Sequence, residues 1–518
     1  MAGKNNDQGV NRMAIRLGPV LQFRGCTGST WRFSALIVTD IGDDIPPLKT
    51  VSPLQQGNTV HLADIPFSNP RYRAWRMELN AAPGSGLVTF ELAGKRYPVH
   101  IPAVGQAPKM AYVSCNGFSD PKLMKSVTHP NANWSRMRSQ HDEQGYHLLL
   151  MGGDQVYSDS IWGKVSALKG WLEKSVDQRQ KVKLGNAALN QIDSFFAELY
   201  IERWAQQEPA AMLAAVPTVM MWDDHDIMDG WGSYPEKLHG SDVHKGIFTA
   251  ARRYFHLFQQ QLKDGGNEVH PASIDGTMNL QFAGLGNVSM LALDLRSERQ
   301  PKPMQIIAPD SWDKIYAWLE GWQPQTAHEP EPQHLLILSS IPLAYLDLSY
   351  LESLLQTLPG QQELEDDLLD HWRSEAHRQE RLRFIHRLFD LATEKHCRIT
   401  LLSGDVHVGA YAVIESQLAR HKEQGKALYQ LVSSGVVHPV PPALVRYVLE
   451  SVAGRQELVE KDIRARQLPL TRKGNYLLGQ RNWLSIEPDE EAQKGRLWCK
   501  WYQEDEDEPI CKVINWRE

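Results

Sequence analysis

Four short apolar runs in this chain each end in side chains of types that commonly bind metals. The runs and the groups that follow them are KMAYVS (109–114) before Cys115, YHLLLM (146–151) before GGDQVY (152–157), TVMMW (218–222) before DDHD (223–226), and RITLL (398–402) before SGDVH (403–407). Short runs rich in β-branched residues, Leu and Met, bounded by polar residues, are typical of buried strands. Because ligands of open α/β sheets bind at the carboxyl ends of the strands, we expect these groups to meet at one edge of a sheet.

The bulk composition is that of an ordinary globular protein. The chain has 518 residues, of which 42% are hydrophobic and 23% charged, and this is enough to bury a large core. The formal net charge of -7 argues against a constitutive nucleic-acid binder, which usually has a basic excess, so nucleic acid enters only as a possible substrate. The five cysteines are odd in number and widely spaced, without a CxxC pair, so they predict neither a disulfide framework nor a zinc ribbon.

The N-terminal sequence predicts a cytoplasmic location. Residues 1–18 have no apolar core of the signal-peptide type and no twin arginine. No apolar run approaches the ~20 residues that a membrane-spanning helix needs. We therefore expect an enzyme without a membrane span, and the sequence gives no indication of its oligomeric state.

The order of predicted elements divides the chain into four parts. Residues 1–13 are expected to be disordered. Residues 14–106 alternate short strands with turns rich in Gly, Pro and Asn, which predicts an N-terminal all-β sandwich domain. Residues 107–442 alternate strands with longer helices, which predicts an α/β (α+β) catalytic domain with helices flanking its sheets. Residues 443–518 begin with a helix and continue in strands, as a C-terminal extension. The helices expected in the catalytic domain are 187–204, 244–263 and 375–395.

The second apolar run leads into an oxygen-rich pair of residues, Asp154 and Tyr157. Carboxylate and phenolate are hard donors that suit Fe(III), Mn or Ca better than copper or structural zinc. Taken alone, the pattern is equally compatible with a turn Asp and a packed Tyr. Cys115, after the first run, is either a metal ligand or a small buried hydrophobic residue.

The third and fourth runs carry stronger signals. Four consecutive ionisable residues at 223–226 are costly to bury unless a metal or hydrogen bonds satisfy them. Within that run, an Asp can bind a cation, and His225 can act as a general acid or base if the following carboxylate orients it. Asp405 and His407 alternate, so in extended backbone both would point to one face, as a pair of metal ligands. The alternatives are an exposed acidic turn and a polar strand end.

Taken together, the motifs resemble those of a known family. The segments are SCNG (114–117), GGDQVY (152–157), WDDHDIMDGWG (222–232), LDLRSER (293–299) and SGDVH (403–407). They resemble the alkaline phosphatase D-type (PhoD-like) phosphatases of the calcineurin-like metallophosphoesterase superfamily, over about residues 109–438. The resemblance implies a metallophosphoesterase-type β-sandwich flanked by helices.

Two segments depart from the family pattern. DHWRSEAHRQER (370–381) looks like an altered Asp-x-Trp-x-Gly-Tyr segment, with Ser374 and Glu375 in place of Gly-Tyr. The isolated middle His of the superfamily is not evident, because the corresponding segment offers only Ser339 and Ser340.

The resemblance also implies a centre of two metal ions. Its implied ligands are Cys115, Asp154, Tyr157, Asp223, Asp224, Asp405 and His407. Asp154 would bridge the two ions, while Tyr157 and Cys115 would bind a ferric-type ion. Asp224 would bind the second ion with Asp223 as a possible addition, and the two C-terminal ligands would complete the coordination. The implied pair is Fe(III) with Ca, and Mn or Zn would suit similar positions.

The predicted activity is metal-dependent hydrolysis of phosphate mono- or diesters through a metal-bridging hydroxide. His225 would be the proton donor, held by Asp226. Arg296 would contact phosphate oxygens, the alternative for it being a surface ion pair. The alternative functions are a non-catalytic metal-binding interaction protein on a phosphatase scaffold, and a nuclease or phospholipase D-like diesterase. The absence of Gly-x-Ser-x-Gly and of a Walker motif argues against a serine hydrolase or a P-loop enzyme.

Overall fold

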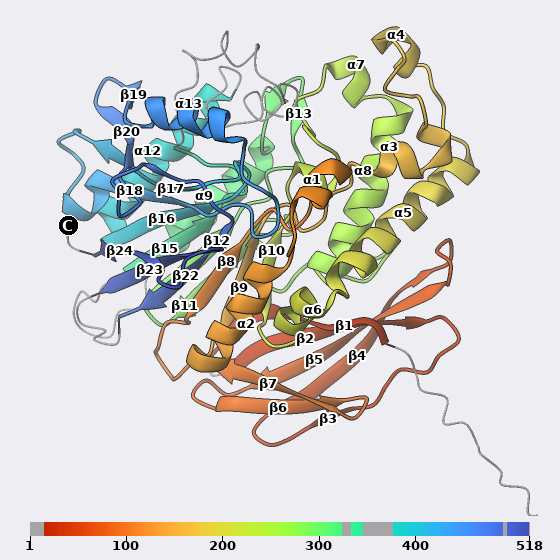
Figure 1. Ribbon diagram of the computed structural model, residues 1–518. Coiled ribbons are helices and arrows are strands. Elements are labelled where there is room, and N and C mark those ends of the chain that lie inside the picture. Colours follow the sequence, from red (N-terminus) through yellow and green to blue (C-terminus); the bar gives the residue numbers. More distant parts are fainter. Residues whose placement is uncertain (1–14, 29, 324–332, 345–376, 490–494, 517–518) are drawn as a thin grey trace, which may run out of the picture.

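The structure is a computed structural model that describes residues 15–28, 30–323, 333–344, 377–489 and 495–516. Two large sheets dominate this part of the chain, one of ten strands and one of nine. Helices lie on the outer faces of the two sheets (Figure 1). The predicted α/β (α+β) architecture with flanking helices is therefore confirmed. The segment 1–13, predicted to be disordered, lies outside the described residues.

The ten-stranded sheet is built around three parallel strands. These are β8 (Met110–Val113), β9 (Leu148–Gly152) and β10 (Thr218–Met221), which are buried along their whole length. They are the first three apolar runs of the sequence. Because they are parallel neighbours, their carboxyl ends and the polar residues that follow lie at the same edge of the sheet.

Strands from both ends of the chain extend this sheet. On one side, β10 pairs in parallel with the N-terminal strand β1, followed by β2, β5 and β4; their bounds are Ile15–Thr27, Thr30–Asp40, Tyr72–Ala81 and Gln55–Ile65. On the other side, β8 pairs with β22, followed by β23 and β24, which span Asn482–Pro488, Arg496–Gln503 and Ile510–Asn515. One sheet thus joins the N-terminal, central and C-terminal parts. The domain bounds proposed from the sequence stay a prediction.

The remaining N-terminal strands form a separate small sheet. It contains β3 (Leu48–Thr50), β6 (Gly86–Leu92) and β7 (Lys95–Ile101). Figure 1 shows these strands as the lower layer beneath β2, β5 and β4. The described N-terminal part is all-β, as the sequence predicted.

The nine-stranded sheet supplies the fourth apolar run. Its parallel strands are β12 (Val288–Ala292), β15 (Gln333–Leu338), β16 (Cys397–Ser403) and β18 (Ala427–Val432). The antiparallel strands β11, β17, β19, β20 and β21 span Leu280–Leu285, Gly409–Ser416, Gln456–Glu460, Ile463–Leu468 and Leu477–Leu478. A short hairpin, β13 and β14 (Gln300–Pro301 and Met304–Gln305), lies apart from both large sheets.

The predicted helices are present with small differences at their ends. The long helices α2, α5, α8, α9, α12 and α13 span Ala132–Gln144, Asn186–Trp204, Asp242–Tyr254, Pro309–Gly321, Arg378–Lys395 and Ala443–Ala453. The helix predicted at 244–263 begins two residues earlier and changes after Tyr254 into a π-helical turn, η3 (Phe255–Gln259). Shorter helices are α1, α3, α4, α6 and α7, at Pro121–Ser126, Ile161–Lys164, Val176–Arg179, Gln207–Leu213 and Glu236–His239, with the 3-10 turns η1, η2 and η4 at Ser166–Leu168, Asp224–Asp226 and Glu423–Lys426.

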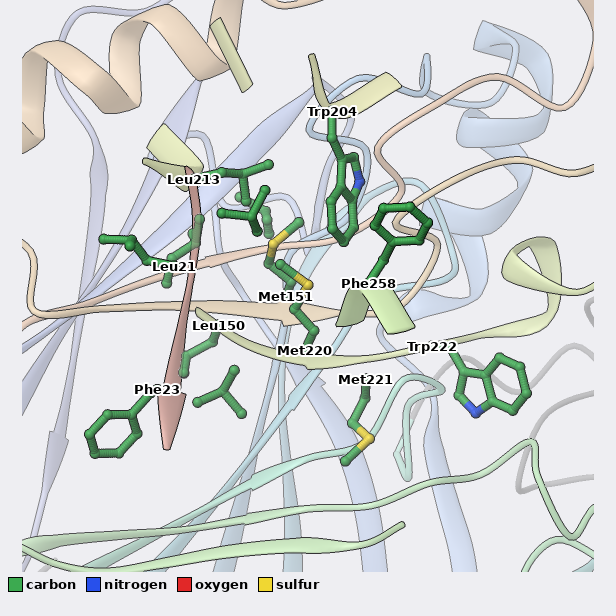
Figure 2. Packing of buried hydrophobic residues seen from close by; sticks show 14 of the residues in the cluster. Leu21, Phe23, Leu150, Met151, Trp204, Leu213, Met220, Met221, Trp222 and Phe258 are labelled. Carbon is green, nitrogen blue, oxygen red and sulfur yellow. The ribbon is translucent and has the colours of Figure 1, made fainter. Parts of the chain in front are cut away.

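A continuous apolar core holds the parallel strands in place. Figure 2 shows part of it, in which the side chains from β1, β9 and β10 are packed near Trp204 of α5 and Phe258 of η3; they include Leu21, Phe23, Leu150, Met151, Met220 and Met221. Full burial of one such side chain stabilises the fold by roughly 1.5–3 kcal/mol. The strand ends that carry the polar groups are therefore fixed by close packing on both faces of the sheet.

None of the helices in the described ranges has both the length and the hydropathy of a membrane span.

The burial of His147 predicts a loss of stability in acid. Its Nδ1 accepts a hydrogen bond from the backbone N–H of Lys109 at 2.9 Å, and burial, with smaller effects of nearby positive groups, lowers its pKa to about 3. An unfolded His has a pKa of about 6.5. Between these values the unfolded chain binds one more proton than the folded chain. The contribution of the buried neutral ring to the free energy of unfolding is therefore full above pH 6.5 and is lost as the pH falls.

We expect His147→Asn to flatten the dependence of the unfolding free energy on pH between 6.5 and 5, by up to about 1.4 kcal/mol per pH unit. Equilibrium urea unfolding across this range measures the slope. The exposed His129 provides the control, and His129→Asn should leave the slope as in the unmodified protein. Equal slopes for all three proteins would contradict the assignment.

Candidate metal centre

Backbone hydrogen bonds join the loops that follow the parallel strands. The N–H groups of Cys115 and Asn116, after β8, donate to the carbonyls of Gly153 and Asp154, after β9, at 3.2 and 2.8 Å. The N–H of Gly404, after β16, donates to the carbonyl of Ser340 at 3.0 Å. Between the two sheets, the N–H of His438, after β18, donates to the carbonyl of Cys115, after β8, at 3.1 Å. The loops of the two large sheets therefore meet at one place, as the strand-end argument predicted.

The side chains predicted as ligands form three overlapping buried groups at this place. In each group the donor atoms lie within 4.8 Å of one another. The first group is Cys115, Asp154 and His407, the second is Asp154, Asp224 and His225, and the third is Asp223, Asp224 and Asp405. Asp154 belongs to two of the groups, and so does Asp224. A chain of overlapping groups, rather than one compact cluster, has the form needed for two neighbouring cations.

The first group also includes the predicted ligand Tyr157. The Cys115 Sγ and the Tyr157 hydroxyl each lie 3.4 Å from Asp154 Oδ2. The same hydroxyl lies 3.3 Å from His407 Nε2. Thiol, carboxyl, phenol and imidazole thus surround one point, and all four are buried.

The third group is rich in carboxylates and is closed by an arginine. Arg296 is fully buried, and its Nε donates to Asp223 Oδ1 while its Nη2 lies 3.5 Å from Asp224 Oδ1. Its Nη1 donates to the carbonyl of Trp231 at 2.9 Å. The alternative of a surface ion pair is therefore wrong, because the guanidinium is inside the protein. Ser340, at the place where no middle His was found, donates its hydroxyl to Asp223 Oδ1 at 2.9 Å.

Four of the predicted ligands have left-handed backbone conformations. The φ angles of Cys115, Asp154, Asp405 and His407 are 54°, 55°, 70° and 53°. Such conformations are uncommon for residues other than Gly and cost on the order of 1–3 kcal/mol each. The extended backbone expected at Asp405 and His407 is therefore wrong, although both side chains do reach the centre. Strain shared by four ligands is typical of a functional site.

Burial concentrates charge that the protein chain only partly compensates. Burial and the neighbouring carboxylates together raise the pKa of Asp154 well above its usual range. Burial alone would lower the pKa of His225, but the carboxylates of Asp159 and Asp224 outweigh it and raise that pKa well above its usual value. A bound cation would relieve the same repulsion between carboxylates.

The residues present fit the cations that the family resemblance implies. Asp154 is 1% exposed, and its Oδ1 has no hydrogen-bond partner among the described residues. A buried carboxylate oxygen without a partner is costly unless a cation binds it. Sulfur, phenol and imidazole donors on one side and carboxylates on the other suit a transition-metal ion beside a harder ion.

His225 is oriented by a residue that the sequence did not indicate. Its Nδ1 lies 3.0 Å from Asp159 Oδ2. Asp226, to which the sequence assigned this task, instead accepts hydrogen bonds from the backbone N–H groups of Gln155, Val156 and Asp223. Asp159 lies two residues after Tyr157, so the one signal in the sequence was a further acidic residue in the same loop.

Two further residues at the centre, Ser434 and His438, come from the loop after β18. The Ser434 hydroxyl lies 3.0 Å from Cys115 Sγ and accepts the backbone N–H of His407 at 2.9 Å. The His438 ring is stacked on the His407 ring, with centroids 3.6 Å apart. Their signal in the sequence was a fifth apolar run, ALYQLV (427–432), that also ends in polar residues.

Comparisons with known proteins bear on the family and the fold. The sequence model of a family described as PhoD-related phosphatase matches residues 109–360 and 352–462. A Saccharomyces cerevisiae protein described as uncharacterized protein YGR266W is 27% identical over 523 aligned positions, and the match covers 84% of this chain and 73% of the yeast protein. A solved structure of PhoD superposes with a TM-score of 0.53 at 14% identity and covers 98% of this chain and 90% of the PhoD chain. The first match confirms the predicted family, and the last confirms the fold.

The close contact between Gly117 and Tyr157 predicts a sensitive position. A Cβ atom at Gly117 would lie 2.4 Å from Tyr157 Cδ2, and the next nearest atoms also belong to this ring and its Cβ. Because the ring cannot move without displacing its hydroxyl from the first group, we expect Gly117→Ala to weaken metal binding about 10–100-fold. Competition with a chelator for Zn(II) measures the affinity.

Gly163→Ala is the matched control, since no heavy atom lies within 4 Å of the added methyl group. Equal metal affinity in the two variants would show that the position of the Tyr157 ring does not matter for binding.

Proposed function

The chain belongs to the family of PhoD-related phosphatases, and from this premise we propose that it is a metal-dependent phosphoric ester hydrolase whose active centre is the candidate metal centre. One observation carries the proposal. The buried group with a thiol and the buried group of Asp224 and His225 share the carboxylate of Asp154. Asp224 also belongs to the group of carboxylates with Asp223 and Asp405. A shared carboxylate between two donor sets is the arrangement by which two metal ions are held a few Å apart.

We assign the ligands to two neighbouring sites that Asp154 bridges. Cys115, Tyr157 and His407 would hold the first ion, for which thiolate and phenolate donors favour Fe(III). Asp223, Asp224 and Asp405 would hold the second, for which an all-carboxylate set favours a hard cation such as Ca. Mn and Zn are the alternatives for the same donor sets.

The mechanism needs one proton donor from the chain itself. Two ions bound there would supply a nucleophile by lowering the pKa of water and would offset charge on the phosphoryl oxygens. His225 is the proposed general acid and would give a proton from Nε2 to the departing alkoxide oxygen. The Asp159 carboxylate at Nδ1 supports this role, because it holds the ring and stabilises its protonated form.

The contacts of Arg296 support a role in holding the ligands. Its guanidinium bonds to Asp223 and lies beside Asp224, so it fixes two carboxylates and offsets part of their charge before a metal binds. We therefore propose that it acts on the phosphate through these carboxylates, in place of the direct phosphate contact expected from the sequence.

The test of the proposal is metal content together with turnover. We expect the purified protein to hold two metal ions per chain and to hydrolyse p-nitrophenyl phosphate, bis(p-nitrophenyl) phosphate or both. Asp154→Asn should lose at least about 100-fold in kcat, since residues that only support metal ligands already cost 10–100-fold. Elemental analysis and steady-state kinetics on the two substrates measure this and separate a monoesterase from a diesterase.

The control is Asp313→Asn, which makes the same chemical change on the exposed face of α9 and should leave both readouts unaltered. Two bound metals without turnover on any phosphate ester would favour a non-catalytic metal-binding protein. A protein with neither metal nor turnover after reconstitution with Fe, Ca, Mn and Zn would refute the proposal.

The pairing of His225 with Asp159 predicts a dependence on the leaving group. Asp159→Asn should lower kcat about 10²-fold or more for an alkyl phosphate, whose leaving oxygen needs a proton. The loss should be much smaller for p-nitrophenyl phosphate, because nitrophenolate leaves without protonation. Metal content should not change. A matched control is Asp390→Asn, which breaks a similar pair in which His421 Nε2 lies 3.1 Å from Asp390 Oδ1. Equal losses for both leaving groups would contradict the proton-donor role.

A further inference from the structure

Three consecutive glutamines, Gln259 to Gln261, lie fully buried where α8 ends in the π-helical turn η3. Buried amides are stable only when their donors and acceptors find partners. Single π-helical turns within helices occur frequently at functional sites. The partners of these glutamines therefore show what the turn supports.

The side chain of Gln259 contacts the candidate metal centre. Its Nε2 donates to Asp226 Oδ1 at 3.0 Å and to the hydroxyl of Tyr200 at 2.8 Å. Asp226 is fully buried and belongs to the turn that carries Asp223 and Asp224.

Asp226 in turn joins the two loops that carry the metal-binding groups. Its carboxylate accepts the backbone N–H groups of Gln155 and Val156 at 3.1 and 3.2 Å, directly after Asp154. It also accepts the N–H of Asp223 at 2.9 Å. A change in the orientation of this carboxylate would therefore move the loops after β9 and β10 relative to each other.

The backbone of the glutamine segment is anchored on the N-terminal strands. Gln22 of β1 donates its side-chain amide to the carbonyl of Gln259. Arg24 of β1 and Arg76 of β5 donate to the next two carbonyls, of Gln260 and Gln261, at 3.0 and 2.6 Å. Three consecutive carbonyls are thus held by side chains from residues 15–81.

We propose that Gln259 is a positioning residue that fixes the Asp226 carboxylate, and through it both metal-binding loops, against the N-terminal strands. The N-terminal strands β1 and β5 then support the metal centre through Gln259 and Asp226. The effect on turnover rests on the proposed function, whereas the effect on loop order does not.

The test compares two isosteric substitutions in the same segment. Gln259→Met removes the hydrogen bonds to Asp226 and Tyr200. Gln261→Met also removes two buried hydrogen bonds, both away from the centre. In one, Gln261 Nε2 donates to the carbonyl of Val20 at 2.9 Å, and in the other, the Ser34 hydroxyl donates to Gln261 Oε1 at 2.7 Å. The two variants should lose similar thermal stability. A difference between them in hydrogen exchange or metal affinity at the centre would therefore come from the location of the lost bonds and not from a general loss of stability.

We expect hydrogen exchange in Gln259→Met to become about 10-fold faster in peptides covering 154–157 and 223–226, whose amides bond to Asp226. Zn(II) affinity should fall about 10–100-fold, and kcat should fall with KM nearly unchanged. In Gln261→Met, faster exchange should be confined to β1 and β2. If Gln259→Met does not fold, Gln259→Glu keeps the shape and places a carboxylate against Asp226, with the same expected result.

Unchanged exchange at 154–157 and 223–226, or the same change in both variants, would overturn the inference. A protein without metal or turnover that still shows the exchange difference would refute the proposed function and leave the positioning role standing. The two ideas therefore fail separately.

Discussion

The concentration of buried carboxylates at one point is the constraint on which the rest of the structure depends. Asp154, Asp223, Asp224 and Asp405 are almost fully buried and belong to overlapping donor groups. Burying an isolated carboxylate costs several kcal/mol per charge, even after the protein relaxes around it. Carboxylates in such an environment therefore need compensating partners. The fold supplies part of the compensation through the buried guanidinium of Arg296, and the donor geometry leaves the rest to bound cations.

The centre is also strained, and the strain is held by close packing around it. Four ligands have left-handed backbone, which the chain would leave if the loops were free. The parallel strands beneath them are buried on both faces, and hydrogen bonds between the loops of Cys115 and Asp154 lock them together. The glutamine segment after α8 adds an anchor on the N-terminal strands, so residues far apart in the chain support the same few side chains.

These two properties support the proposed hydrolysis of phosphate esters at this centre. Carboxylates held apart by a rigid frame bind cations without having to reorganise, and this is what makes a site effective for a charged substrate. A thiol and a phenol on one side and carboxylates on the other give the two halves different preferences for metals. The His225 ring, paired with Asp159, lies next to the shared carboxylate and is the proton donor in the proposed mechanism, a group that simple metal storage would not require.

The sequence by itself determined the strands and the chemical nature of their ends. An apolar run followed by ligand-type residues is a local pattern, so Cys115, Asp154 and the 223–226 run could be found without knowing the fold. The pairing of His225 with Asp159 and the burial of Arg296 were decided only by tertiary structure. Both depend on side-chain directions and on contacts between distant segments, and backbone as unusual as that of the ligands has no local signature in residues other than Gly. Tertiary structure also decided that the N-terminal and central strands share one sheet. The pairing between β1 and β10 joins segments about 200 residues apart, which no local pattern specifies.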